Sequence, residues 1–167
     1  MGSMSAKGTP AITAVDVAGI AYTLHEYPHH PGADSFGLEA ATALGCEPAR
    51  VLKTLVAAID GPRGHQLVVA LVPVDCQLDL KALAAALGSK RAEMAKPADA
   101  ERATGYVVGG ISPLGQRKQL PTVVDASANK HATIFVSGGR RGLELELRAT
   151  DLVRITGGLL ATIARQD

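Results

Sequence analysis

Apolar and polar positions alternate in several short stretches of the chain. Alternation predicts β-strands, because successive side chains of a strand point to opposite faces. A turn-forming sequence, DGPRG, separates two of these stretches, so they are expected to pair as a hairpin. The strands predicted in this way span residues 21–27, 49–59, 65–74, 106–110, 122–126, 133–137 and 143–148.

Helices are predicted between these strands from their boundary residues and apolar spacing. The clearest one covers residues 80–87, where apolar residues recur at i, i+3, i+4 and i+7 between the cap residue Asp79 and Gly88. Thr150 is a suitable cap for the last helix. The predicted helices cover residues 10–18, 36–44, 80–87, 97–104 and the segment after Thr150.

The order of these elements predicts an α+β fold. Many short strands follow one another without regular βαβ alternation, which favours a curled, mixed and mainly antiparallel sheet. We expect this sheet to be barrel-like, with the helices packed on its outside. One domain should cover residues 9–165, whereas residues 1–8 are expected to be disordered and to begin with an expression scar.

Composition narrows the classes of function. The 167 residues carry a net charge of +1 and include three tyrosines, two phenylalanines and no tryptophan. Such a chain lacks both the charge for broad nucleic-acid binding and the rings for a stacking platform, so DNA is not an expected partner and RNA contact should be local. No apolar stretch is long enough to span a bilayer and no secretory signal is found, so we expect a cytoplasmic protein without membrane contact.

Lys53 interrupts the apolar sequence ARVLKTLVAAI, residues 49–59. Apolar side chains surround it on both faces of the predicted strand. Burying an unpaired ammonium group costs several kcal/mol, so this lysine should be paired, neutral or open to a cleft. No acidic residue lies in the same strand, which favours a cleft; the alternative is an edge-strand lysine that reaches water.

Two glycine-rich stretches are candidate binding loops. In GYVVGGISPLGQRK, residues 105–118, the glycines allow close approach of the backbone to an oxyanion or phosphate, and Arg117 and Lys118 could meet a nucleic-acid backbone. In VSGGRRG, residues 136–142, Ser137 stands at the tip of a strand. For the first stretch the alternative without a ligand is a glycine-bulged strand and a proline turn. For the second, a plain hairpin turn explains the sequence at least as well as a binding loop does.

Other chemistry is weakly indicated. The histidines of HEYPHH lack the spacing of a metal site, so neither a metal nor another cofactor is expected. No Ser-His-Asp or Cys-His arrangement is recognisable that would supply a nucleophile. Glu144 and Glu146 alternate with leucines, which predicts that both face solvent from a half-buried strand.

Several segments together resemble one known family. The sequences YTLHEY, FGLEAATALG, RVLKTLV, TGYVVGGISPLGQ and TIFVSGGRRGLELEL are similar to those of the YbaK family of free-standing Cys-tRNA(Pro) deacylases. This trans-editing group is related to the inserted editing domain of bacterial prolyl-tRNA synthetases. The resemblance runs from about Thr9 to Arg165 and departs from the family pattern at Cys46 and Cys76.

The resemblance implies roles for individual residues. Lys53 matches a pocket lysine required for deacylation, and Gly109 begins a loop that holds the carbonyl and the terminal adenosine, with amides that can stabilise an oxyanion. Glu144 falls where a family acid can lie. The remaining residues that match the substrate pocket are Tyr27, Phe36, Thr54, Gly110, Ile111, Ser112, Pro113, Ser137 and Gly138.

The resemblance also implies an activity and partners. The substrate would be the 3′ end of tRNA(Pro) mischarged with cysteine, whose own thiol attacks the ester, and prolyl-tRNA synthetase could join a ternary complex. Two alternatives remain: a deacylase of the same fold for another mischarged tRNA, such as Ala-tRNA(Pro), and a non-catalytic module that binds a nucleotide or phosphate.

Overall fold

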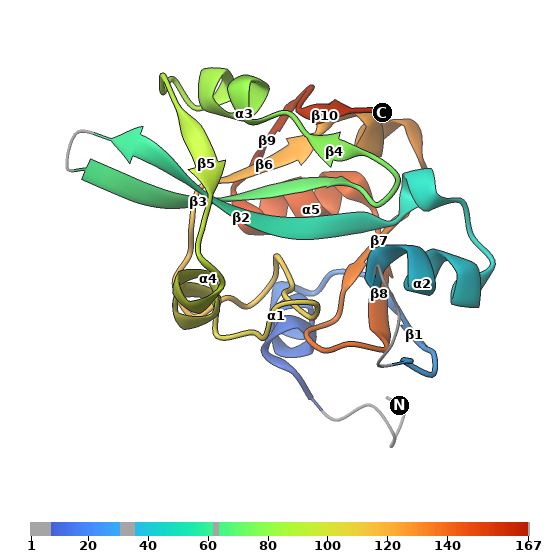
Figure 1. Ribbon diagram of the computed structural model, residues 1–167. Coiled ribbons are helices and arrows are strands. Elements are labelled where there is room, and N and C mark those ends of the chain that lie inside the picture. Colours follow the sequence, from blue (N-terminus) through green and yellow to red (C-terminus); the bar gives the residue numbers. More distant parts are fainter. Residues whose placement is uncertain (1–7, 31–35, 62–63, 167) are drawn as a thin grey trace.

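A long two-stranded hairpin forms the centre of the structure (Figure 1). The computed structural model describes residues 8–30, 36–61 and 64–166. Strands β2 (Leu52–Gly61) and β3 (Gly64–Pro73) have ten residues each and pair antiparallel from Leu52 opposite Pro73 to Gly61 opposite Gly64. The hairpin predicted from the DGPRG turn is therefore confirmed.

Three further strands extend the hairpin into a mixed sheet with the order β5-β2-β3-β6-β9. Strand β5 (Ala92–Met94) pairs antiparallel with β2, but only opposite residues 57–59. On the other side, β6 (Thr122–Asp125) and β9 (Leu159–Ala161) add in parallel. The first half of β2 consequently has β3 along one edge and no paired neighbour from β5 along the other.

A second sheet has the order β1-β8-β7, all antiparallel, from β1 (Thr23–Glu26), β7 (Ile134–Ser137) and β8 (Leu143–Leu147). A single bridge between Val51 and Phe135 connects it to the start of the hairpin. Strands β4 (Gln77–Leu78) and β10 (Ala164–Arg165) form a third, small sheet. The predicted α+β class with mainly antiparallel pairing is confirmed, but the described strands form three sheets and no closed barrel.

Helices cover both faces of the hairpin. Helices α1 (Pro10–Ala18) and α5 (Ala149–Thr156) contribute to the same apolar cluster as Leu71 of β3. Helix α3 (Leu80–Ala86) packs through Leu83 on the opposite face. The remaining helices are α2 (Phe36–Leu44), α4 (Pro97–Thr104) and the 3₁₀ helices η1 (Pro48–Arg50) and η2 (Ala126–Lys130). No helix within the described ranges is long and apolar enough to cross a membrane.

Two predictions about local structure were wrong. Residues 106–110 form a turn and not a strand: Gly109 has a φ of 93°, the Gly110 N–H donates to the Val107 carbonyl, and Val107 stays exposed. The last helix begins at Ala149, after Arg148, so Thr150 lies inside it and is not its cap. The prediction of a disordered N-terminus concerns residues 1–8, of which 1–7 lie outside the described part of the chain.

Asp125, at the end of β6, fastens the C-terminal segment to the central sheet. Its Oδ1 accepts hydrogen bonds from the N–H groups of Ile163 and Ala164, both at 2.9 Å, and its Oδ2 accepts one from the Ser127 N–H. The residue is 4 % exposed. A buried carboxylate that satisfies several backbone donors is costly to remove, because the donors lose their partners.

We therefore expect Asp125→Ala to lower the free energy of unfolding by about 2–4 kcal/mol, since it leaves backbone N–H groups unsatisfied in the interior. Urea denaturation followed by circular dichroism would measure the change. Asp60→Ala is the matched control: Asp60 is exposed, its ion pair with His65 is 3.6 Å long, and its loss should cost less than about 0.5 kcal/mol. Equal effects of the two substitutions would contradict this account of Asp125.

Candidate functional site

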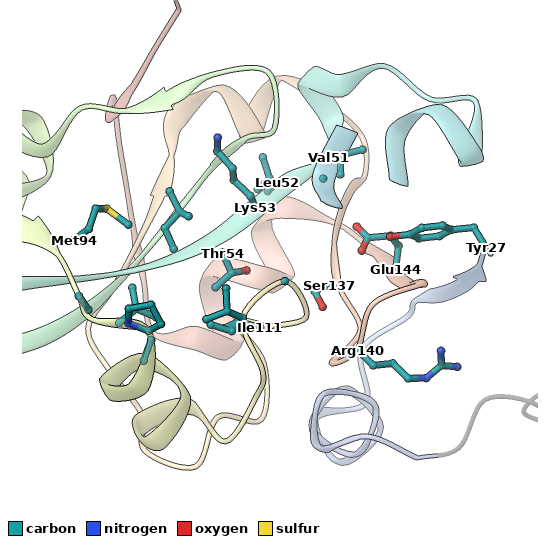
Figure 2. Close-up of a pocket in the computed structure, with 18 residues that line it drawn as sticks. Tyr27, Val51, Leu52, Lys53, Thr54, Met94, Ile111, Ser137, Arg140 and Glu144 are labelled. Atoms are coloured by element: carbon teal, nitrogen blue, oxygen red, sulfur yellow. The ribbon is translucent and has the colours of Figure 1, made fainter. Parts of the chain in front are cut away.

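A cavity of about 410 Å³ lies against the edge of β2 that β5 leaves open (Figure 2). Its walls come from β2, from the loop before residue 112, from the ends of β7 and β8, and from the segment that joins β5 to α4. The lining residues are Tyr27, Gly37, Val51, Leu52, Lys53, Thr54, Leu55, Val56, Met94, Ala95, Pro97, Ala100, Val108, Gly109, Ile111, Ser137, Arg140 and Glu144.

Glu144 is the buried acid of this cavity. It lies on β8, opposite Ser137 of β7, and only 7 % of the residue is exposed. Burial raises the pKa of its carboxyl group to about 8, because the charged form loses its hydration. No hydrogen bond to this carboxyl group is found among the described residues. Glu144 is therefore mainly neutral at pH 7, and the prediction that it faces solvent was wrong.

Glu146, two residues further along β8, has the opposite environment. Its carboxylate accepts hydrogen bonds from Thr133, from His25 at 2.9 Å and from Arg50 at 3.4 Å. The bond from Thr133 is the largest of the influences that lower the pKa of Glu146. Hydrogen bonding to the charged form thus keeps this acid ionised, while its neighbour in the cavity lacks such donors.

Thr54 and Tyr27 bring further polar groups to the same end of the cavity. The Thr54 Oγ1 is the one buried side-chain oxygen or nitrogen in the described structure without a hydrogen-bond partner, and Figure 2 shows it on the side of Ser137. Burial, with the nearby Glu144 as the second cause, raises the pKa of the Tyr27 phenol to about 12. Figure 2 shows the Tyr27 hydroxyl directed at the Glu144 carboxyl group.

Lys53 lines the cavity but faces away from this polar end. Neighbouring strand residues point to opposite faces, so its side chain leaves β2 on the face opposite to Thr54. Figure 2 shows its ammonium group directed away from Ser137 and Glu144. Within the described residues, no carboxylate forms an ion pair with it.

The two glycine-rich loops lie side by side. A Cβ on Gly110 would lie 3.0 Å from the Arg140 Cα, and the Arg141 guanidinium donates a hydrogen bond of 2.6 Å to the Val108 carbonyl. Gly109 borders the cavity. The Gly110 N–H donates to the Val107 carbonyl at 2.8 Å, so the expectation that this amide is available for an oxyanion was wrong.

Of the other residues named from the sequence, Ile111 and Ser137 line the cavity. Ser112 and Gly138 are not among the lining residues. The Ser112 Oγ is a buried acceptor for the Leu114 N–H, and the Gly138 N–H donates to the Leu143 carbonyl. These two residues shape the loops without reaching the cavity.

Three further residues lie away from the cavity. Pro113 borders a separate groove beside α1. The main-chain N–H groups of Arg117 and Lys118 donate to carbonyls at the end of α4, and neither side chain lines the cavity. The side chain of Phe36 lies outside the described part of the structure.

Sequence reasoning missed several lining residues. Gly37 lies so close to Val74 that a Cβ would stand 2.3 Å from its Cγ1, a constraint that becomes visible only in three dimensions. Met94 and Pro97 come from the short strand β5 and the start of α4, and β5 was not predicted. Arg140, which pairs with Glu26 at 3.2 Å, was signalled only by its place in VSGGRRG.

The chemistry of the cavity follows from this inventory. Its polar side chains are hydroxyl groups, a neutral acid and two cations at its borders; neither histidine nor cysteine is among the described lining residues. The described chain also contains no group of three or more His, Cys, Asp or Glu side chains arranged for a metal ion. The cavity is suited to hold a small polar group inside apolar walls.

Comparison with known proteins agrees with this architecture. The family model described as "Aminoacyl-tRNA editing domain" matches residues 30–155. A relative from Enterococcus faecalis, named "Putative Cys-tRNA(Pro)/Cys-tRNA(Cys) deacylase EbsC", is 37% identical over 95% of this chain and 94% of its own. Another from Escherichia coli, named "Multifunctional Ser/Thr-tRNA deacylase ProXp-y", is 32% identical over 74% of this chain and 72% of its own.

A solved structure of similar description has the same fold. A solved structure described as "a putative trans-editing enzyme for prolyl tRNA synthetase" superposes with a TM-score of 0.81 at 24% identity, covering 93% of this chain and 95% of that one. The resemblance to the YbaK family is thereby confirmed. The chain belongs to the family of aminoacyl-tRNA editing domains.

Proposed function

We propose that this editing domain removes cysteine from mischarged Cys-tRNA(Pro). The observation that carries the proposal is the make-up of the cavity, where Thr54, Ser137 and the neutral acid Glu144 line a space with mainly apolar walls. A short polar side chain fits such surroundings better than a purely aliphatic one. The name of the Enterococcus faecalis relative supports cysteine as that side chain.

Size alone cannot separate cysteine from proline reliably. A pocket gains only about 1–3 kcal/mol from a difference of one methylene group, which corresponds to roughly 10- to 200-fold discrimination. A chemical criterion is stronger, because proline has no nucleophile in its side chain. The cysteine thiol can therefore distinguish the cysteine ester from the proline ester and also act as the nucleophile.

In the proposed reaction the cysteinyl sulfur attacks the carbonyl carbon of its own ester. A carbon–sulfur bond forms, the bond from that carbon to the ribose oxygen breaks, and the thiol proton passes to this oxygen. The products are a cyclic thiolactone and free tRNA. Such an internal attack needs no protein nucleophile, because a well-oriented internal group has an effective concentration of about 10⁵ M or more.

The protein then has to orient the substrate and stabilise the oxyanion. The Gly109 main chain, at the border of the cavity, is the proposed oxyanion donor, and one good donor contributes about 3 kcal/mol. Glu144 in its neutral form can donate a hydrogen bond without placing a negative charge beside the oxyanion. Lys53, whose ammonium points away from Glu144, is proposed to bind the phosphate of the terminal nucleotide.

The tRNA body requires a further partner in this proposal. With a net charge of +1, the chain offers few phosphate contacts, so its affinity for tRNA should be modest and sensitive to salt. Prolyl-tRNA synthetase, which holds tRNA(Pro), is the proposed partner. The encounter would take place in the cytoplasm, where translation occurs.

Serine or threonine esters are a second candidate substrate. The Escherichia coli relative named as a Ser/Thr-tRNA deacylase favours them, and the hydroxyls of Thr54 and Ser137 can bond to a substrate hydroxyl as well as to a thiol. The difference lies in the reaction, because a hydroxyl is a much poorer nucleophile than a thiol.

A panel of tRNA(Pro) esters of cysteine, serine, threonine, alanine and proline separates these possibilities. We expect cysteine to be removed fastest in single-turnover assays, serine at least about tenfold more slowly, and proline not at all. Equal rates for cysteine and serine would indicate attack by water. Fastest removal of serine or threonine would favour the second candidate, and fastest removal of alanine would favour an alanine-editing activity of the same fold. Binding of the esters without any turnover would favour a non-catalytic module.

Lys53→Ala should lower the single-turnover rate at least about a hundredfold, because the terminal nucleotide loses its anchor. Circular dichroism should show an unchanged fold. Lys81→Ala, which removes an exposed lysine from α3, is the control and should change the rate less than about twofold. Near-normal activity of the Lys53 variant would refute its role.

Glu144 should also make stability depend on pH. Its folded pKa of about 8 lies above the ordinary value of 4.5, so the unfolded chain ionises first. The stability contributed by the neutral carboxyl is complete below pH 4.5 and is lost as pH rises through about 8. Thermal unfolding between pH 5 and 9 should therefore show a decline in Tm that Glu144→Gln reduces. Glu146→Gln, which replaces an acid that is already ionised, should keep the decline; identical slopes in all three proteins would contradict the assignment.

A further inference from the structure

The edge of β2 away from β3 has no paired strand beside Thr54, and Thr54 lines the cavity. In a strand, the N–H and C=O groups of successive residues point alternately to the two edges. The Val51 carbonyl points to the β3 side, where it accepts from the Val74 N–H at 2.9 Å. The Val56 carbonyl points to the other side, where it accepts from the Ala95 N–H at 3.0 Å. By alternation, both main-chain groups of Thr54 point to the side away from β3.

Within the described structure, no strand pairs with β2 at Thr54 on that side. The pairing with β5 covers residues 57–59, and the bridge to β7 is at Val51. The donor and the acceptor of Thr54 thus lie in the gap between these two contacts, on the wall of the cavity. The Thr54 Oγ1 on the same residue is shielded from water and also lacks a hydrogen-bond partner. Polar groups shielded from water and left unpaired are rare unless a ligand completes them.

An aminoacyl ester carries the complement of these two groups. Its α-ammonium group is a donor and its ester carbonyl is an acceptor, separated by one carbon as in a residue of a β-strand. Peptides bind to exposed sheet edges through the same alternation of donor and acceptor. A single aminoacyl group is the smallest ligand that can use both groups of one strand residue.

We infer that the aminoacyl group binds as one added strand residue at Thr54. The Thr54 carbonyl accepts a hydrogen bond from the α-ammonium group, and the Thr54 N–H donates to the ester carbonyl. Residues opposite each other across a strand pair have their side chains on the same face. The substrate side chain therefore lies beside the Thr54 hydroxyl and in front of Ser137. The inference rests on the proposed deacylase function and adds recognition of the α-amino group to it.

The first test removes the α-amino group from the substrate. The wild-type protein is given tRNA(Pro) charged with cysteine or with 3-mercaptopropionate, and with serine or 3-hydroxypropionate. We expect the acceleration over the uncatalysed rate to fall at least about thirtyfold for each ester that lacks the amino group. Equal acceleration within each pair would overturn the inference but leave the deacylase function intact. Failure to accelerate any of the amino-acid esters would overturn the proposed function itself.

The second test removes the main-chain donor. Thr54→Pro deletes an N–H that pairs with no strand, and proline is tolerated at such an edge. Thr54→Ala is the control for the side chain, and Leu55→Pro, whose N–H points to β3, is the control for a broken ladder. We expect Thr54→Pro to retain the fold, unlike Leu55→Pro, and to deacylate at least about thirtyfold more slowly than Thr54→Ala. Equal rates for the two Thr54 variants would overturn the inference. If Thr54→Pro does not fold, the comparison of the cysteine ester with the 3-mercaptopropionate ester decides whether the inference holds.

Discussion

The site depends on the unequal pairing of one strand. Strand β3 covers β2 along its whole length, whereas β5 covers only residues 57–59 of the opposite edge. The ladder of the hairpin fixes β2, and the bridge from Val51 to Phe135 of β7 holds its start, so the open half keeps its position without pairing to β5. That open half forms a wall of the cavity, and the two glycine loops and β8 close the space in front of it. A longer β5 would pair with the edge at Thr54 and fill the cavity with main chain.

Burial of Glu144 lowers the stability of the fold, whereas the hairpin ladder raises it. Two acids of the same strand show the difference. Glu146 receives hydrogen bonds and stays charged, while Glu144 lacks them and its pKa rises to about 8. A protein selected for stability alone would place an apolar residue at such a position, because an unpaired polar group in the interior is a net loss. In the proposed function, contact with the aminoacyl group offsets this cost.

The sequence predicted the elements well and the environment of single side chains less well. Local signals decide elements, so Asp79 marks a helix start correctly and DGPRG marks the hairpin. The solvent exposure of Glu144 depends on segments far away in the chain, which alternation with leucines cannot reveal. The same limit explains the failure at residues 106–110, where positive φ at Gly109 and contact with the second loop turn an apparent strand into a turn. Similarity to a family named seven of the eighteen cavity residues in advance. Arg117 and Lys118, which were named from their place after a glycine-rich stretch, lie elsewhere.

Alternation along β2 finally explains why the strand carries both a lysine and a threonine in its open half. Neighbouring side chains leave a strand on opposite faces, so Lys53 and Thr54 cannot serve the same part of a ligand. One aminoacylated nucleotide has two unlike ends, a phosphate and an amino acid, joined by a ribose. A strand that crosses the middle of this ligand can reach the anionic end with the ammonium group of one residue and the aminoacyl end with the main chain of the next. The lysine that looks misplaced in an apolar strand is, in this arrangement, the neighbour that the binding edge requires.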